Sequence, residues 1–104
     1  FASRPAVQRE IYETVVGHLN TLGPVHVDAV QVGVFLKRAS KFAELRPKSR
    51  WLSLELVLPR LLANTRISRT IPLSSTRIVH ILKLTAVHDV DDELRDWLTE
   101  AYLA

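Results

Sequence analysis

The sequence contains no cysteine. Without thiols the chain forms no disulfide, has no thiolate nucleophile and offers no cysteine ligand to zinc or an iron–sulfur cluster. Such a chain suits a reducing compartment, and we expect a cytoplasmic protein. No apolar run approaches the roughly 18 residues that a membrane-spanning helix needs, and no charged and then apolar leader opens the chain. We therefore expect no membrane partner.

Glycine is also scarce, with three residues in 104. Gly17, Gly23 and Gly33 are too far apart to form the glycine-rich loop that cradles a phosphate. One class of nuclease carries Glu-x-Lys on a strand, and neither Glu44-Leu45-Arg46 nor Glu55-Leu56-Val57 matches that pattern. A small domain without these groups is expected not to be an enzyme.

Four histidines invite a metal hypothesis: His18, His26, His80 and His88. No two of them stand at the i, i+4 spacing of helical zinc ligands, so we expect no metal site and no cofactor. His80 falls on the apolar side of a strand, where a hydrogen-bonded structural histidine is the favoured interpretation. His26 shares a strand face with Asp28, and either a charge pair or a solvated edge fits this pattern.

At 104 residues, with 47% hydrophobic and 24% charged residues, the chain has the size and proportions of one globular domain covering residues 1–104. Its net charge of +3 tolerates an acidic partner without indicating one.

The first predicted element is an amphipathic helix that starts at Pro5, a residue suited to the first turn. Gly23 and Pro24 end it, with glycine as a left-handed cap. Its apolar stripe repeats every three or four residues and consists of Val7, Ile11, Val15, His18, Leu19 and Leu22.

A short strand at 25–28 then leads into a central meander at 30–58, in which apolar and polar residues alternate. The predicted strands are 30–38, 41–46 and 51–58, and Pro59 ends the last one. Two rows are expected to face the core: Val30, Val32, Val34 and Leu36 on one strand, and Leu52, Leu54, Leu56 and Leu58 on another.

Residues 60–76 are the hardest to interpret: 61–63 suggest a helical turn, and Ile67 with Ile71 suggest a short edge strand ending at Pro72. Residues 77–84 alternate again, and a closing helix follows, capped by Asp89 or Asp91. Its apolar stripe is Val90, Leu94, Trp97, Leu98, Ala101 and Tyr102. The sequence thus predicts an α+β fold, with an antiparallel sheet of about five strands and an N-terminal and a C-terminal helix on one face.

Several segments carry a family resemblance: Leu22-Gly23-Pro24-Val25, Val34-Phe35-Leu36-Lys37-Arg38, Lys41-Phe42-Ala43, Leu52-Ser53-Leu54-Glu55-Leu56, and the close from Val90-Asp91-Asp92-Glu93-Leu94 through Trp97-Leu98 to Ala101-Tyr102. In this order they resemble a bacterial family of domains of unknown function, number 5655. That family occurs alone or at the C-terminal end of so-called predicted transport proteins. The resemblance implies the same α+β layout, and it does not point to any particular reaction.

Charge is polarised along the chain, with six basic residues against one acid in 37–50 and six acids against one base in 89–100. The basic residues belong to two turns at opposite ends of the predicted strand 41–46. A strand of six residues is ~20 Å long, so the two groups of charges lie far apart. Arg60 follows the last strand of the meander and is expected to lie at the same end of the sheet as the turn from Arg38 to Lys41. The candidate anion-binding residues are therefore Lys37, Arg38, Lys41 and Arg60. Solvated turn charges that keep the sheet edge from pairing are the favoured alternative.

The face of the meander opposite the core is mixed, and it presents Phe35 and Trp51 as candidate partner or ligand contacts. We expect a non-catalytic binding or protein-interaction module, whose partner is a second copy in a homodimer or another protein. A weak nucleic-acid-binding domain that uses the basic hairpin is the second hypothesis. The third is an accessory part of an enzyme completed by a missing segment.

Overall fold

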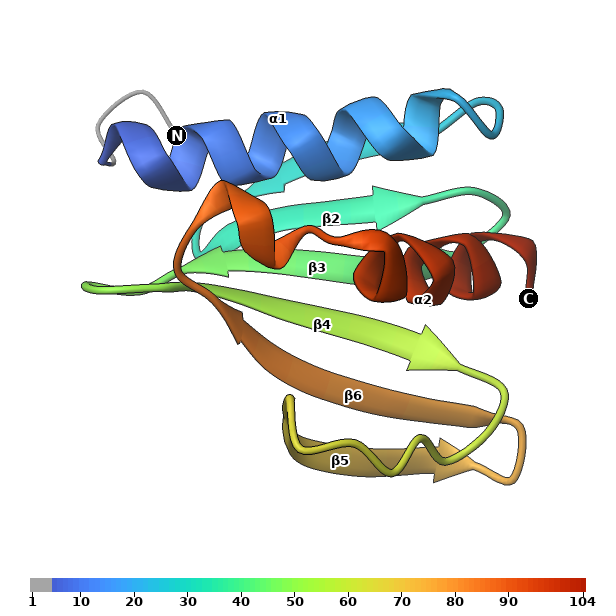
Figure 1. Cartoon of the computed structure of the whole chain (residues 1–104). Coiled ribbons are helices and arrows are strands. Elements are labelled where there is room, and N and C mark those ends of the chain that lie inside the picture. The colour runs from blue at the N-terminus through green and yellow to red at the C-terminus, as the bar shows by residue number, and fades with distance from the viewer. Residues whose placement is uncertain (1–4) are drawn as a thin grey trace.

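The computed structural model describes residues 5–104, which form a six-stranded antiparallel sheet with both helices on one face (Figure 1). In chain order the elements are α1 (Ala6–Asn20), β1 (His26–Val30), β2 (Gly33–Lys37), β3 (Lys41–Pro47), β4 (Leu52–Leu58), β5 (Ile67–Ser74), β6 (Arg77–Leu84), the 3-10 helix η1 (Val87–Asp89) and α2 (Asp92–Leu103). The strand order is β1-β2-β3-β4-β6-β5. The predicted α+β class is confirmed.

The sheet has six strands and not about five. The predicted strand 30–38 is also wrong at its start. Val30 belongs to β1 and pairs with Gly33 across a tight turn at residues 31 and 32. Val32 is therefore 55% exposed at that turn instead of facing the core. Alternation does not reveal the turn, because apolar residues continue through it.

Helix α1 covers the sheet through Ile11, Val15 and Leu19, which are fully buried. The prediction is wrong for Val7, which is 40% exposed. The first turn of α1 lies over the β3–β4 turn, where Gln8 is the buried residue and its Nε2 donates to the carbonyl oxygens of residues 48 and 51. The end of α1 also differs from the prediction, because it stops at Asn20, before Gly23.

Gly23 has a φ of +150°, a backbone conformation that residues other than glycine rarely adopt. A Cβ at this position would lie 2.6 Å from the hydroxyl oxygen of Tyr102. That hydroxyl donates a 2.9 Å hydrogen bond to the carbonyl oxygen of Pro24. Close approach of α2, rather than helix capping, is therefore why glycine is required at 23.

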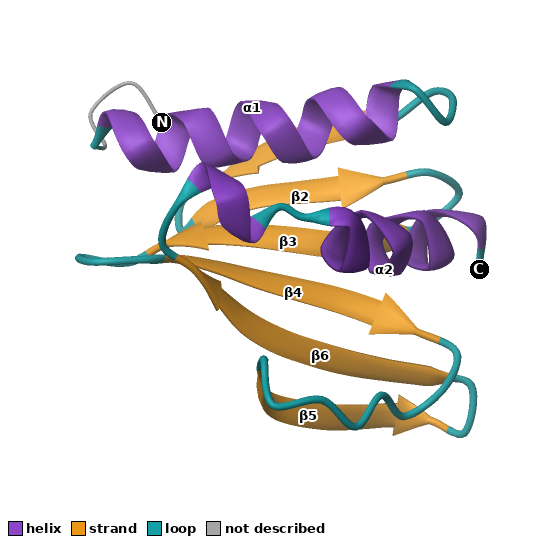
Figure 2. Ribbon diagram, in the orientation of Figure 1, coloured by secondary structure: helices purple, strands orange, loops and turns teal. Residues whose placement is uncertain are grey.

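Both helices cover the same face of the sheet (Figure 2), and the buried apolar side chains of the helices and the strands form one core. The predicted row on β4 is confirmed in full, since Leu52, Leu54, Leu56 and Leu58 are all 0% exposed. The predicted stripe of the closing helix is also buried, including Trp97. Asp91 is its N-cap and accepts a 3.0 Å hydrogen bond from the backbone N–H of Leu94. This bond lowers the pKa of Asp91.

The predicted helical turn at 61–63 is wrong, because residues 59–64 run as an irregular loop. Arg66 holds the end of this loop in place through the carboxylates of Asp91 and Glu93 at 2.9 and 3.2 Å. The predicted edge strand exists but continues past Pro72 to Ser74 as β5. An edge strand tolerates proline, because a backbone N–H that points away from the sheet has no strand to pair with and its loss breaks no hydrogen bond of the sheet. Within residues 5–104, neither helix is long and apolar enough to cross a membrane.

Candidate interaction face of the sheet

The face of the sheet turned away from the helices has no helix over it (Figure 1). Residues paired across neighbouring strands lie on the same face of a sheet, so the register identifies its members. We call this surface the open face and define it by Asp28, Phe35, Lys37, Lys41, Glu44, Arg46, Ser53, Glu55, Val57, Arg69, Ile71, Val79, Ile81 and Lys83, with Trp51 at its rim. Apolar side chains and charges of both signs are mixed on it.

Phe35 is half-buried near one side of the open face and has cations over its ring. The Lys41 ammonium lies 4.2 Å from the ring centroid and that of Lys37 lies 5.9 Å from it. Lys37 also pairs with Asp28 at 3.0 Å, and the hydrogen bond from its ammonium lowers the pKa of that carboxyl. Phe35 is thus held inside a small charged cluster.

A β-bulge sets the direction of two side chains beside this cluster. The β2–β3 register shifts between Leu36 and Lys37, which leaves Phe42 as the extra residue on β3. Lys41 therefore reaches the open face, while the Phe42 ring packs edge-on against Tyr102 with centroids 5.6 Å apart. The sequence pattern gives no sign of this bulge.

Glu44 is the residue of the open face that sequence reasoning missed. It is 3% exposed, and its carboxylate binds Lys41 at 3.2 Å and Arg46 at 2.7 Å. The hydrogen bond to Glu44 raises the pKa of Arg46. Glu55 lies directly across from Glu44 on β4 and makes no ion pair within the described residues. Alternation alone places Glu44 on this face, but only the neighbouring side chains bury it.

Trp51 is half-buried at the far end of the β3–β4 hairpin, where the Lys83 ammonium lies 4.5 Å from its ring centroid. The turn before it is closed by a hydrogen bond of 2.9 Å from the N–H of Lys48 to the carbonyl oxygen of Trp51. Lys48, Arg50 and Lys83 have no acidic partner among residues 5–104. One cation therefore lies over the Trp51 ring, and two more belong to the adjoining turn.

The four candidate anion-binding residues lie at one end of the sheet but meet different partners. Lys37 and Lys41 come together over Phe35. Arg38 donates to the carbonyl oxygen of Tyr102 at 3.1 Å and stacks on its ring at 4.6 Å. Arg60 forms two hydrogen bonds with Glu100, at 2.9 and 3.0 Å, and these raise its pKa.

The histidines take separate structural positions. His80 is 0% exposed, its Nε2 accepts from the N–H of Leu62 at 2.9 Å, and its Nδ1 donates to the carbonyl oxygen of Ile78. The prediction of a structural histidine is confirmed. His18 contacts the Thr99 hydroxyl at 3.0 Å. His26 is exposed, and the carboxylate of Asp28 pairs with Lys37 instead. Within residues 5–104, no three His, Cys, Asp or Glu side chains are grouped to hold a metal ion.

Comparison with known proteins gives one match. A family model described as "Domain of unknown function (DUF5655)" covers residues 1–104. No curated protein and no solved structure matches the chain. The description names no activity, so the chemistry of the open face is the guide to function.

Proposed function

The chain belongs to the DUF5655 family of domains of unknown function, and we propose that it is a non-catalytic interaction module whose open face binds a second copy of the same chain. The family resemblance implies a bacterial protein, sometimes joined to predicted transport proteins, and we extend the proposal to a cytoplasmic setting. The observation that supports it is a whole sheet face without helix cover that carries half-buried aromatic and aliphatic side chains.

The apolar content of the open face suits burial against another surface. Val57, Val79 and Ile81 are half-buried near its middle, with Phe35 and Trp51 to either side. Aromatic anchors and aliphatic centres are the groups that dominate the energy of protein interfaces. With strands about 4.8 Å apart and about 3.3 Å per residue, the face measures roughly 25 Å by 20 Å. This is the same order as the ~800 Å² that each partner buries in a standard interface.

The charges on the open face favour a second copy as the partner. In the part of the chain that the structure describes, Glu55 near the centre makes no ion pair. Lys83 on β6 and Arg69 on β5 make none with these residues either. In an isologous dimer each contact occurs twice, so Glu55 of one copy meets a cation of the other and the reverse holds at the symmetric position. Opposite charges set the register of such an interface.

Sedimentation equilibrium of the purified chain tests this proposal. We expect a concentration-dependent dimer that Trp51→Ala weakens by at least tenfold, since aromatic anchors contribute most. Leu103→Ala is the matched control, because Leu103 is an exposed apolar residue (62%) on helix α2 and not on the open face. A monomer at all concentrations overturns the proposal.

A charge-swap pair tests the contact itself. Glu55→Lys and Lys83→Glu each place like charges at both symmetric contacts, so each variant alone is expected to dimerise weakly. A mixture of the two restores both pairs and is expected to form the heterodimer. Failure of the mixture to associate, when the wild-type chain does, assigns the dimer to a different surface.

Nucleic-acid binding is the second candidate, and the free cations around Trp51 favour it. An aromatic ring flanked by unpaired lysine and arginine is the arrangement by which many proteins hold single strands. Binding to a generic single strand should then fall steeply with salt. Lys48→Ala with Arg50→Ala should reduce it more than Lys37→Ala with Lys41→Ala, whose ammonium groups already pair with carboxylates. The opposite ranking points to the first basic turn.

A further inference from the structure

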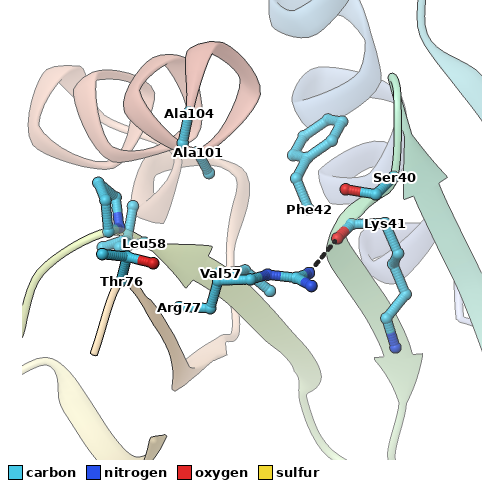
Figure 3. Close-up of a pocket in the computed structure, with 10 residues that line it drawn as sticks. Ser40, Lys41, Phe42, Val57, Leu58, Thr76, Arg77, Ala101 and Ala104 are labelled. Atoms are coloured by element: carbon cyan, nitrogen blue, oxygen red, sulfur yellow. Dashed lines mark hydrogen bonds between the residues drawn. The ribbon is translucent and has the colours of Figure 1, made fainter. Parts of the chain in front are cut away.

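A pocket of about 390 Å³ lies at the end of the sheet beside the last turn of α2 (Figure 3). Four segments meet there: the start of β3, the end of β4, the β5–β6 turn and the end of α2. Its lining residues are Ser40, Lys41, Phe42, Val57, Leu58, Pro59, Thr76, Arg77, Ala101 and Ala104. The volume is within the range of small-molecule sites, which begins at about 300 Å³.

One wall of the pocket is apolar and firmly held. Phe42 is 5% exposed and its ring is fixed by the edge-on contact with Tyr102. Leu58 and Ala101 are buried at 0% and 2% exposure and belong to the core. This wall is therefore preformed and accepts a hydrocarbon group without rearrangement of the core.

Apart from Lys41, which pairs with Glu44, the polar side chains of the pocket bind no carboxylate among residues 5–104. No aspartate or glutamate lines it. The guanidinium of Arg77 points across the pocket and makes one long hydrogen bond, 3.4 Å, to the carbonyl oxygen of Lys41 (Figure 3). The hydroxyl groups of Ser40 and Thr76 have no hydrogen-bond partner among the described residues.

Arg77 differs in this respect from most other arginines at the ends of the sheet. Arg60 and Arg66 each bind a carboxylate through short hydrogen bonds, and Arg38 binds a helix carbonyl. A guanidinium binds carboxylates in a planar, two-pronged geometry that neutral groups do not match. Arg77 has the capacity for such a pair and has no carboxylate partner among residues 5–104.

From these contacts we infer that the pocket binds a small organic carboxylate. Its carboxylate pairs with the Arg77 guanidinium and accepts from the hydroxyl groups of Ser40 and Thr76. Its short apolar body lies against Phe42 and Ala101. The pocket borders the open face and shares Lys41 and Val57 with it. The inference rests on the contacts of Arg77 and not on the proposed dimer.

Titration of the isotope-labelled chain with hexanoate, followed by backbone amide chemical shifts, tests this inference. We expect saturable shifts confined to the pocket, around Phe42, Thr76 and Ala101. Hexylamine and hexanol, which have the same hydrocarbon body, should bind at least tenfold more weakly. Equal binding of all three probes overturns the assignment of a carboxylate ligand, because it would mean that the pocket recognises the hydrocarbon body alone.

Two variants and one control test whether Arg77 and Thr76 bind the carboxylate. Arg77→Gln should weaken hexanoate binding at least tenfold, and Thr76→Val should weaken it a few-fold. Arg69→Gln is the matched control, because Arg69 is an exposed arginine on the neighbouring strand β5 and is not part of the pocket lining. Both Arg77 and Thr76 are exposed, so the variants should keep the wild-type amide spectrum outside the pocket. Unchanged affinity in both variants refutes the proposed site.

Discussion

The two basic turns of the central hairpins look alike in sequence and differ in the structure. At the first turn, which joins β2 to β3, Lys37 pairs with Asp28, Lys41 with Glu44, and Arg38 binds the last turn of α2. At the second turn, which joins β3 to β4, the side chains of Lys48 and Arg50 pair with no acid among the described residues. The first turn is thus a structural junction and the second a free cationic surface.

The elements that surround each turn produce this difference. The first turn lies under the end of α2 and beside β1, which supply a carbonyl oxygen, an aromatic ring and a carboxylate. At the second turn, Gln8 of α1 donates to the backbone carbonyl oxygens of Lys48 and Trp51. These bonds provide no counter-charge for the side chains of Lys48 and Arg50. Positive charge that is clustered in the sequence therefore stays unpaired only where the described fold brings no counter-charge to it.

The largest expected effect comes from removing Tyr102, which anchors the first turn. Tyr102→Ala takes away the ring that meets Phe42 and Arg38, and also the hydroxyl that binds Pro24. Truncation of a buried aromatic residue costs about 3–5 kcal/mol of unfolding free energy. Urea denaturation measures the loss. Tyr102→Phe, which keeps the ring, should cost about 1–2 kcal/mol; equal losses in both variants would mean that the ring contacts contribute little.

The second turn has its own anchor, and its removal should cost less. Gln8→Ala takes away both hydrogen bonds, 2.8 and 3.2 Å long, from Nε2 to the carbonyl oxygens of Lys48 and Trp51. Leaving buried groups without partners costs about 1–3 kcal/mol, again measured by urea denaturation. Glu10→Ala, an exposed position on the same helix, is the control. Loss of stability without a change in Trp51 fluorescence would show that the turn is held by other contacts.

Acid titration tests the ion pair between Lys37 and Asp28, which belongs to the first turn and has no counterpart at the second turn among the described residues. The hydrogen bond from Lys37 and its charge lower the folded-state pKa of Asp28, so the stability from this pair is present above the ordinary value near 3.9 and is lost as pH falls through the lowered pKa. NMR of the Asp28 carboxyl carbon measures the midpoint. Lys37→Met should move it upward, toward the ordinary value. A midpoint that does not move would mean that Lys37 is not the cause.

The smallest expected effect is at the free cations of the second turn. Lys48→Ala combined with Arg50→Ala should change the free energy of unfolding by no more than about 0.5 kcal/mol, because neither side chain has an ion pair with residues 5–104 to lose. Arg38→Ala at the first turn should cost about 1 kcal/mol or more, since it removes both a hydrogen bond and a ring contact. Denaturation of the two variants side by side decides the comparison; equal costs contradict it.

Much of the fold was predictable because backbone geometry is local. Alternation on β4 and β6 places Leu54, Leu56 and Leu82 in the core, and all three are fully buried. The same alternation places His80 among them and indicates that it needs hydrogen-bond partners, which Leu62 and Ile78 provide. Prediction failed at Val32 and in the 61–63 segment, where a tight turn and an irregular loop carry apolar residues that resemble ordinary strand or helix positions.

The candidate site was less predictable. The sequence places Phe35 and Trp51 on one face, and both lie half-buried at the open face or its rim. It gives no reason to choose Glu44, because the burial of that carboxylate requires Lys41 and Arg46 to close over it from both sides. Arg77 was equally hidden, since its pocket forms only where four distant segments meet.

The sequence by itself determined the class of fold, the direction in which most strand side chains point and the stripe that α2 buries. It did so because helix and strand periods depend on residues a few positions apart. Only the tertiary structure decided what Arg38 and Arg60 bind, since their partners lie 64 and 40 positions away in the sequence. Charge partners at such separations are set by the packing of α2 against the sheet, which no local pattern records.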